Sequence, residues 1–378
     1  MWSVFKGRFP RAYADRERQP GVHALVIGVS SYPKLAAKNL LGLEQLTCAA
    51  TSAAEFANWL LEAYPEGGEI PLRSVRLLLS PSDQEETAMQ RFQTADSPRA
   101  NQNNVEEALI AWADDMDWCA GNFAVMYVAG HGVNSTGLGP HLLLEDFRDS
   151  HGLRASLDTS SIHLNLGYFP RVSRSALFVD CCQNLLPDSA LKLGDGLALP
   201  YNSTRAETRD GSAVYFAAPR GESALGVVGG RTLFLDTLLK CLRDGQAGEP
   251  RAGREGWCVN SYSLNSALQA LIPPEQTLDA RLERKEFEIC LISGVPSSKI
   301  AVRVQPPTSH IGTAGQITSE DEESVVPFEM TQNPQPVGVR CGTYTVSLQA
   351  QPGTVRPRRR IAVVKPPLGG TVEFEVLK

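Results

Sequence analysis

A histidine and a cysteine in this chain each follow directly on a run of apolar residues. His131 comes after the run 123–130, and Cys182 comes after the run 176–181. Both runs are rich in β-branched and aromatic residues, which predicts two buried strands. Open α/β sheets bind ligands at the carboxyl ends of their parallel strands, so we expect the two side chains to meet there. An imidazole beside a thiol favours nucleophilic attack on a carbonyl carbon, because the imidazole removes the thiol proton or stabilises the thiolate.

The neighbours of this pair extend the prediction. Acyl transfer needs hydrogen-bond donors for the developing oxyanion, and the backbone N–H groups of Gly132 and Cys182 are suited to that role. Successive side chains of a strand point to opposite faces. If Cys182 faces the crevice, Cys181 therefore faces the opposite layer, and Asp180 points to the same side as Cys182. Taken alone, each residue also has a structural interpretation: a strand-end cap for His131 and core packing for Cys182.

The composition sets the class of protein. The chain has 378 residues with a formal net charge of −6, which predicts two domains and argues against a nucleic-acid partner. Residues 1–20 contain no apolar core of a signal peptide, and no run of about 18 apolar residues predicts a membrane span. The eight cysteines include no Cys-x-x-Cys pair, so we expect no metal site, free thiols and a cytoplasmic location.

The chain changes its pattern near residue 285. Before it, expected strands at 23–30, 75–79, 123–130, 176–181 and 213–218 alternate with expected helices at 49–64, 103–116, 232–242 and 262–272. This alternation predicts an α/β domain over 21–275 with a mostly parallel sheet flanked by helices, preceded by an extension at 1–20. Short strands without helical periodicity follow, so residues 285–378 predict a small antiparallel β-sandwich. The segment 313–325 is expected to be a mobile acidic loop.

Four segments, taken in order, resemble the caspase-like cysteine peptidases, particularly the metacaspases and the bacterial caspase-like effectors. They are Gly130-His131-Gly132, Asp180-Cys181-Cys182, the segment 215–224 and the segment 229–239. The likeness covers about residues 20–272, and the spacing of 51 positions between histidine and cysteine (182 − 131) agrees with it. Found together in this order, the four segments are specific for the caspase-like peptidases, although each segment alone is not.

The resemblance implies roles for these residues. His131 would be the general base, Cys182 the nucleophile, and Asp180 a pocket carboxylate for the Arg or Lys before the cut bond; the alternative for Asp180 is a backbone cap. The long segment 185–211 would be the linker between a large and a small subunit, cut during activation at Lys192, Arg205 or Arg209; the alternative is an ordered, uncut loop. Calcium activates some metacaspases, but no acidic cluster here indicates a site, so we predict no cofactor.

The implied function is a cysteine endopeptidase that cleaves proteins after a basic residue, as a regulated effector in bacterial antiviral defence or cell death. The C-terminal β domain would bind a regulatory protein partner. Two departures concern specificity: residues 47–52 lack the acid that metacaspases carry there, and Gln183-Asn184 follows the nucleophile. The alternatives are a catalytically silent caspase-like scaffold and a transferase that uses the same pair. The presence of both His131 and Cys182 argues against the scaffold.

Overall fold

The computed structural model of the chain describes residues 19–35, 42–64, 70–92, 97–134, 139–148, 153–185, 196–200, 210–305, 312–349, 359–367 and 369–375. Within these residues the backbone contacts define two compact units. The first contains residues up to 239 together with 272–289, and the second contains 240–271 together with 290–378. The change of sequence pattern near residue 285 therefore falls within the segment 272–289, which belongs to the first unit.

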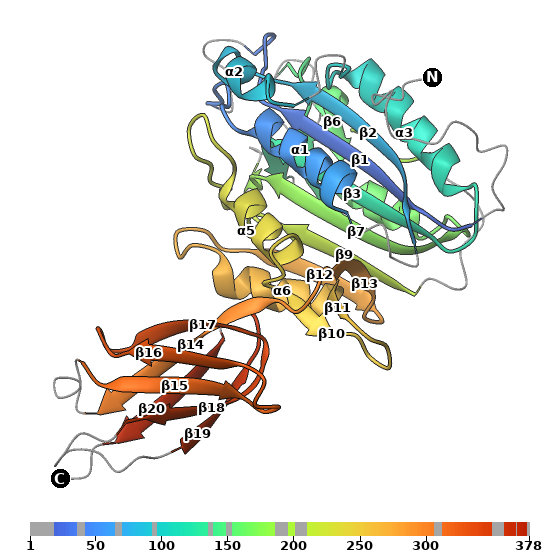
Figure 1. The fold of residues 1–378 in the computed structure, drawn as a ribbon. Helices are drawn as coiled ribbons and strands as arrows, with labels where there is room; N and C mark the ends of the chain where they lie inside the picture. The colour runs from blue at the N-terminus through green and yellow to red at the C-terminus, as the bar shows by residue number, and fades with distance from the viewer. Residues whose placement is uncertain are drawn as a thin grey trace. The chain divides into compact units, whose positions relative to one another are not determined.

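The first unit is built on a six-stranded, mostly parallel sheet, as the sequence predicted (Figure 1). The strand order is β12–β9–β7–β3–β1–β2, and only β12 runs antiparallel to its neighbour. The strands are β1 (Val22–Val29), β2 (Leu72–Ser80), β3 (Asn122–Gly130), β7 (Val172–Cys181), β9 (Gly211–Phe216) and β12 (Asp279–Arg284). The chain leaves β1 first toward β2 and then, through β3, toward β7, so the strand order reverses at β1. Crevices form at such reversals.

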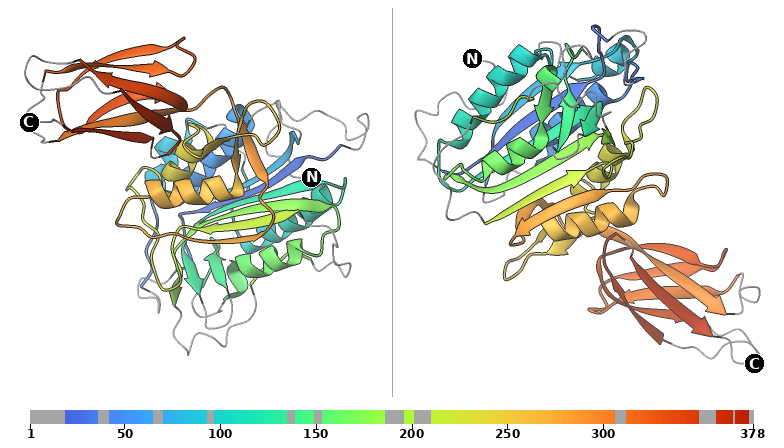
Figure 2. Two further views of the ribbon diagram at one scale, coloured as in Figure 1. Left: turned by 90° about the horizontal axis from the view of Figure 1, so that it is seen from below. Right: turned by 180° about the vertical axis from the view of Figure 1, so that it is seen from behind.

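Helices cover both faces of this sheet (Figure 2). On one face Phe56 stacks on Tyr127 with ring centroids 4.6 Å apart, and a side chain at Gly28 would lie 2.6 Å from the Cβ atom of Ala53. On the other face Trp112 is fully buried and donates its indole N–H to the backbone of His23. The helices are α1 (Ala49–Asn58), continued by a π-helical turn (Trp59–Ala63), α2 (Glu86–Met89) after a 3₁₀ turn (Asp83–Glu85), α3 (Gln102–Met116), α4 (Thr159–Leu166) and α5 (Leu233–Leu242).

A second, small sheet begins where β3 and β7 end. Its strand order is β6–β5–β4–β8, with β4 (Gly132–Asn134), β5 (Pro140–Leu143), β6 (Ser156–Asp158) and β8 (Asn184–Leu185). β5 pairs antiparallel with β4, so the two strands form a hairpin. β4 also pairs in parallel with β8. The segments that follow β3 and β7 therefore remain hydrogen-bonded to each other beyond the ends of those two strands.

The second unit contains a three-stranded sheet, a helix and a β-sandwich. The first two comprise β10 (Gly248–Pro250), β11 (Trp257–Asn260), α6 (Ser261–Leu271) and β13 (Glu288–Ile292). The sandwich has the sheets β17–β14–β20 and β16–β15–β18–β19, which enclose a common apolar core. Its strands are β14 (Ser297–Gln305), β15 (Ala314–Ser319), β16 (Val325–Glu329), β17 (Gln335–Arg340), β18 (Gly342–Leu348), β19 (Arg359–Val364) and β20 (Gly370–Glu375).

Two features of the sandwich differ from the prediction. β14 and β20 pair in parallel, although the other strand pairs of the sandwich are antiparallel. The expected mobile loop at 313–325 is wrong, because β15 and β16 form a hairpin there. Ile317 of β15 is fully buried, and the acidic residues 320–323 form only the exposed turn.

Candidate active site

Strand pairing brings His131 and Cys182 to neighbouring positions. The last pair between β3 and β7 joins Gly130 to Cys181, and His131 and Cys182 are the next residues of the two chains. Adjacent strands lie about 4.8 Å apart, so the two backbones are side by side at the carboxyl edge of the sheet. We call His131 and Cys182 the candidate dyad.

Gly132 makes this close approach possible. A Cβ atom at position 132 would lie 2.0 Å from the carbonyl oxygen of Cys182 and 2.5 Å from the Sγ atom of Cys181. Those separations are far below van der Waals contact, so only glycine fits here without moving the cysteines. The backbone of Gly132, which we expected at an oxyanion hole, is thus packed directly against that of Cys182.

The imidazole of His131 is held by two contacts. Its Nε2 atom lies 2.6 Å from the carbonyl oxygen of Glu44. Because a carbonyl only accepts, Nε2 carries the proton and Nδ1 is left as the basic atom. The hydroxyl of Tyr32 accepts a hydrogen bond from the His131 backbone N–H at 2.9 Å, and the two rings lie 5.0 Å apart. Burial lowers the pKa of His131, and the Glu44 carbonyl opposes this shift only in part.

The thiol of Cys182 lies against the segment that follows β9. Its Sγ atom accepts the backbone N–H of Ala224 at 3.3 Å. Burial raises the pKa of Cys182, and the charge of Asp180 raises it further; hydrogen bonds from Ala224 and Ser223 act in the opposite direction. The thiol and the imidazole are therefore both neutral in the free protein at neutral pH.

Cys181 and Cys182 face opposite layers, as strand alternation predicted. Cys181 is 2 % exposed and belongs to the apolar core that also contains Trp112 of α3 and Leu166 of α4. Burial raises its pKa well above the ordinary value. Cys182 is partly exposed on the α1 face. Of the two thiols, Cys182 is the one exposed to solvent.

Asp180 is a buried carboxylate on the same face as Cys182. One oxygen, Oδ2, accepts hydrogen bonds from the hydroxyls of Tyr127, at 2.5 Å, and Thr232. The other oxygen, Oδ1, has no hydrogen-bond partner among the described residues, although Asp180 is only 2 % exposed. Burial raises the pKa of Asp180 to about 6, and the two hydroxyls oppose the shift. A buried carboxylate oxygen without a donor favours an incoming cation.

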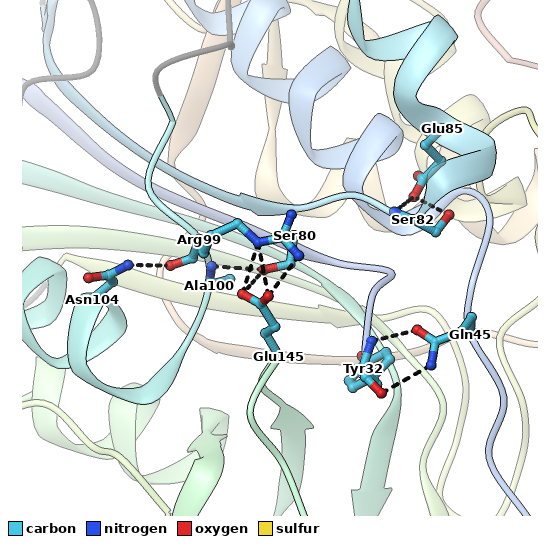
Figure 3. A network of polar contacts seen from close by, with 9 residues as sticks. All are labelled: Tyr32, Gln45, Ser80, Ser82, Glu85, Arg99, Ala100, Asn104 and Glu145. Carbon is cyan, nitrogen blue, oxygen red and sulfur yellow. Dashed lines mark hydrogen bonds and ion pairs between the residues drawn. The ribbon is translucent and has the colours of Figure 1, made fainter. Parts of the chain in front are cut away.

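A second buried carboxylate, Glu85, was not predicted as part of the site. Glu85 has no exposed surface, and its Oε1 atom accepts the backbone N–H of Thr51 in the first turn of α1. Its Oε2 atom accepts both the backbone N–H and the hydroxyl of Ser82 (Figure 3). Residues 47–52 themselves carry no acid, but a carboxylate reaches this helix start from the segment after β2. A negative charge is favourable at a helix N-terminus.

Cys48 lies within electrostatic range of both carboxylates. It precedes α1 and is partly exposed, and a side chain at Gly226 would lie 2.5 Å from its Sγ atom. Burial, together with the charges of Asp180 and Glu85, raises the pKa of Cys48 to about 12. The face of the sheet beside Cys182 is therefore acidic.

Lys192, Arg205 and Arg209, the expected cleavage positions, lie outside the described residues. Within the described part of the chain no group of three or more His, Cys, Asp or Glu side chains is placed to hold a metal ion. None of the described helices has both the length and the apolar character to cross a membrane.

Comparison with known proteins leaves the family open. No protein-family model matches the chain, and no curated protein matches it. Among solved structures, protein GSU0716 from Geobacter sulfurreducens is similar at 14% sequence identity and a TM-score of 0.43, over 70% of this chain and 94% of that chain. A likeness of this size carries no argument about function.

Proposed function

We propose that this protein is a caspase-like cysteine endopeptidase. The observation that carries the proposal is the placement of the candidate dyad on adjacent strand ends, with the proton of the imidazole fixed on Nε2 by the Glu44 carbonyl. This leaves Nδ1 as the atom that accepts a proton. An imidazole oriented by a third group and adjacent to a nucleophile is the arrangement of cysteine and serine hydrolases.

The chemistry follows from this arrangement. Nδ1 of His131 takes the thiol proton as the Sγ atom of Cys182 attacks the scissile carbonyl carbon. The backbone N–H groups of Gly132 and Cys182 stabilise the oxyanion of the tetrahedral intermediate. His131 then gives its proton to the leaving amine, the C–N bond breaks, and an acyl-enzyme remains on Cys182. A water molecule, deprotonated by His131, hydrolyses the thioester and regenerates the thiol.

The acidic face beside Cys182 supports a preference for a basic residue before the cut bond. The Oδ1 atom of Asp180 lacks a donor, and Glu85 adds a second negative charge near the same position. The guanidinium of arginine or the ammonium of lysine would supply the missing donor and neutralise the buried charge. Asp180 would then be the residue that sets specificity, with Tyr127 and Thr232 orienting its carboxylate.

The wider role remains a proposal drawn from the resemblance to metacaspases and bacterial caspase-like effectors. In that role the chain would be a regulated cytoplasmic effector in defence or cell death. The β-sandwich would bind a regulatory protein, and the peptidase would need no cofactor.

A fluorogenic panel with Arg, Lys or Asp before the cut bond tests the proposal. We expect wild-type protein to cleave the Arg and Lys substrates, and Cys182→Ala and His131→Ala to lose activity by at least about 10³-fold. Cys181→Ala is the matched control, because it removes the neighbouring thiol on the opposite face and retains the candidate dyad. Cleavage that survives Cys182→Ala would refute the assignment of the nucleophile. Absence of cleavage of any peptide or protein by the full chain would favour the scaffold.

A further inference from the structure

The segment 217–225 follows β9 and carries the hydrogen-bond donor that reaches the thiol of Cys182. The backbone N–H of Ala224 donates to the Sγ atom at 3.3 Å, and this bond opposes the rise that burial gives to the pKa of Cys182. Residues 222–225 belong to no helix or strand, so no regular ladder of hydrogen bonds fixes the direction of this donor. Contacts from other segments must hold it in place.

The side-chain amide of Gln276 joins the two ends of this segment. Its Oε1 atom accepts the backbone N–H of Leu225 at 3.1 Å, and its Nε2 atom donates to the carbonyl of Ala217 at 2.8 Å. In the sequence Gln276 lies between α6 and β12, and only 3 % of it is exposed. Its own backbone N–H donates to the carbonyl of Pro273 at 3.0 Å, which closes a turn. A buried amide whose oxygen and nitrogen both have partners resists displacement, because either group left unpaired would cost free energy.

One peptide plane connects Gln276 with Cys182. The peptide bond between Ala224 and Leu225 is trans, so its C=O and N–H groups point in opposite directions. The N–H group binds Gln276, and the carbonyl oxygen lies 3.8 Å from the Sγ atom of Cys182. The N–H of Ala224 itself is separated from this plane by a single Cα atom. Loss of the Gln276 contact would free the rotations at that atom, and the donor would no longer be held on the sulfur.

The earlier part of the segment is attached to the chain of the nucleophile. Gln183, which follows Cys182, exchanges backbone hydrogen bonds of 2.9 Å with Gly221 and Glu222. Its side chain donates to the carbonyl of Ala218 at 2.6 Å. These bonds end two residues before the donor. The backbone around the donor is thus anchored by one buried glutamine before it and by a second, Gln276, after it.

We infer that Gln276 is a positioning residue for the nucleophile, which keeps the backbone N–H of Ala224 on the Sγ atom of Cys182 and so stabilises the thiolate. The inference rests on the proposed peptidase function, in which the thiol proton passes to His131 as the sulfur attacks. A hydrogen bond to an ionised acceptor is about twice as strong as one between neutral groups, so this donor contributes most when the sulfur is anionic. Gln276 acts through the peptide and is not itself a catalytic residue.

Gln276→Met tests this role, since it keeps the length of the side chain and removes both polar groups of the amide. The readout is the rate at which iodoacetamide alkylates Cys182 as a function of pH, followed by peptide mapping. We expect the rate at neutral pH to fall by about ten-fold and the profile to move up by about one pH unit, because the thiolate loses a hydrogen bond. For the arginine fluorogenic substrate, kcat should fall by about ten-fold with KM nearly unchanged. A purely structural role predicts the opposite sign for alkylation, because a loosened segment exposes the thiol and relieves the burial that raises its pKa.

Gln335→Met is the matched control. Gln335 also accepts backbone N–H groups, those of Thr331 and Gln332, but it belongs to the second unit, so the wild-type profile should remain. Gln276→Asn keeps the amide and shortens the side chain by one methylene, and it should move the profile in the same direction; it carries the test if Gln276→Met does not fold.

Unchanged or faster alkylation of Cys182 in the folded Gln276 variants would overturn the inference. Alkylation does not require cleavage, so the two proposals can fail separately. If wild-type protein cleaves no substrate and the alkylation rate still falls in Gln276→Met, only the peptidase function is wrong. If wild-type protein cleaves the arginine substrate and the alkylation rate is unchanged, only the positioning role is wrong.

Discussion

The Nε2 atom of His131 lies 2.6 Å from the carbonyl oxygen of Glu44, in the segment that leads into α1. This contact fixes both the tautomer and the direction of the ring. The neighbouring residue Gln45 secures the segment, since its amide accepts the backbone N–H of Tyr32 and donates to the Tyr32 carbonyl (Figure 3). Tyr32 in turn binds the backbone of His131 through its hydroxyl. The orientation of the imidazole thus depends on the β1–α1 segment as well as on β3.

Tyr32→Phe should reduce turnover more than substrate binding. The change removes the acceptor of the His131 N–H and leaves that buried donor unpaired, which costs about 1–3 kcal/mol. We expect the free energy of unfolding in urea to fall by about that amount and kcat to fall by about ten-fold, with KM nearly unchanged. Tyr262→Phe, at an exposed tyrosine of α6, is the control. A wild-type kcat in Tyr32→Phe would show that the Tyr32 hydroxyl does not position His131.

Alkylation should distinguish the two adjacent cysteines. Iodoacetamide reacts with thiolates, and Cys182 is partly exposed whereas Cys181 is 2 % exposed in the core. We expect peptide mapping by mass spectrometry to find the adduct on Cys182. The rate should keep rising as the pH increases above 8, because burial holds the pKa of Cys182 above its ordinary value. First modification of Cys181 in the native protein would contradict the assigned strand faces.

Much of the fold and the face of each candidate residue could be predicted, because both depend on local periodicity. The apolar runs before His131 and Cys182 are β3 and β7, and the period of two places Cys181 in the core and Asp180 beside Cys182. These features need only the order of residues along one strand.

The supports of the site could not be predicted, because they come from distant segments or from the backbone. The acceptor for His131 is the carbonyl of Glu44, and any residue type supplies that group. Glu85 reaches the start of α1 from a segment 34 positions away. The cap of α3 is Asn101, whose side chain accepts the backbone N–H of Asn104. Asn103 and Asn104 lie near the same helix start and have the same capping chemistry, so only the backbone geometry selects among the three asparagines.

Gly132→Ala should damage both stability and activity. The added Cβ atom would lie 2.0 Å from the carbonyl oxygen of Cys182, so the strand ends that carry the candidate dyad must separate. Overpacking of this kind costs about 1–3 kcal/mol, and we expect kcat/KM to fall by about 10²-fold or more as the dyad separates. Gly338→Ala on β17 is the control, because nothing lies within 4 Å of its added Cβ atom. Thermal unfolding and kinetics of both variants provide the test, and wild-type activity in Gly132→Ala would refute the close approach.

The selectivity for a basic residue should depend on pH through Asp180. Burial raises the pKa of Asp180 to about 6 in the free protein. Below this pH the carboxyl is neutral and gains little from a cation, and above it the ionised form attracts the guanidinium of an arginine substrate. The ratio of kcat/KM for an arginine substrate to that for its citrulline counterpart should therefore rise as the pH increases through about 6. The titrations of His131 and Cys182 affect both substrates equally and cancel in this ratio.

Asp180→Asn, which retains an oxygen acceptor for Tyr127 and Thr232, should keep the ratio low and independent of pH. A ratio that is flat in wild-type protein, or that still rises in Asp180→Asn, would place the selectivity on another carboxylate, and Glu85→Gln would then identify whether the second buried acid carries it.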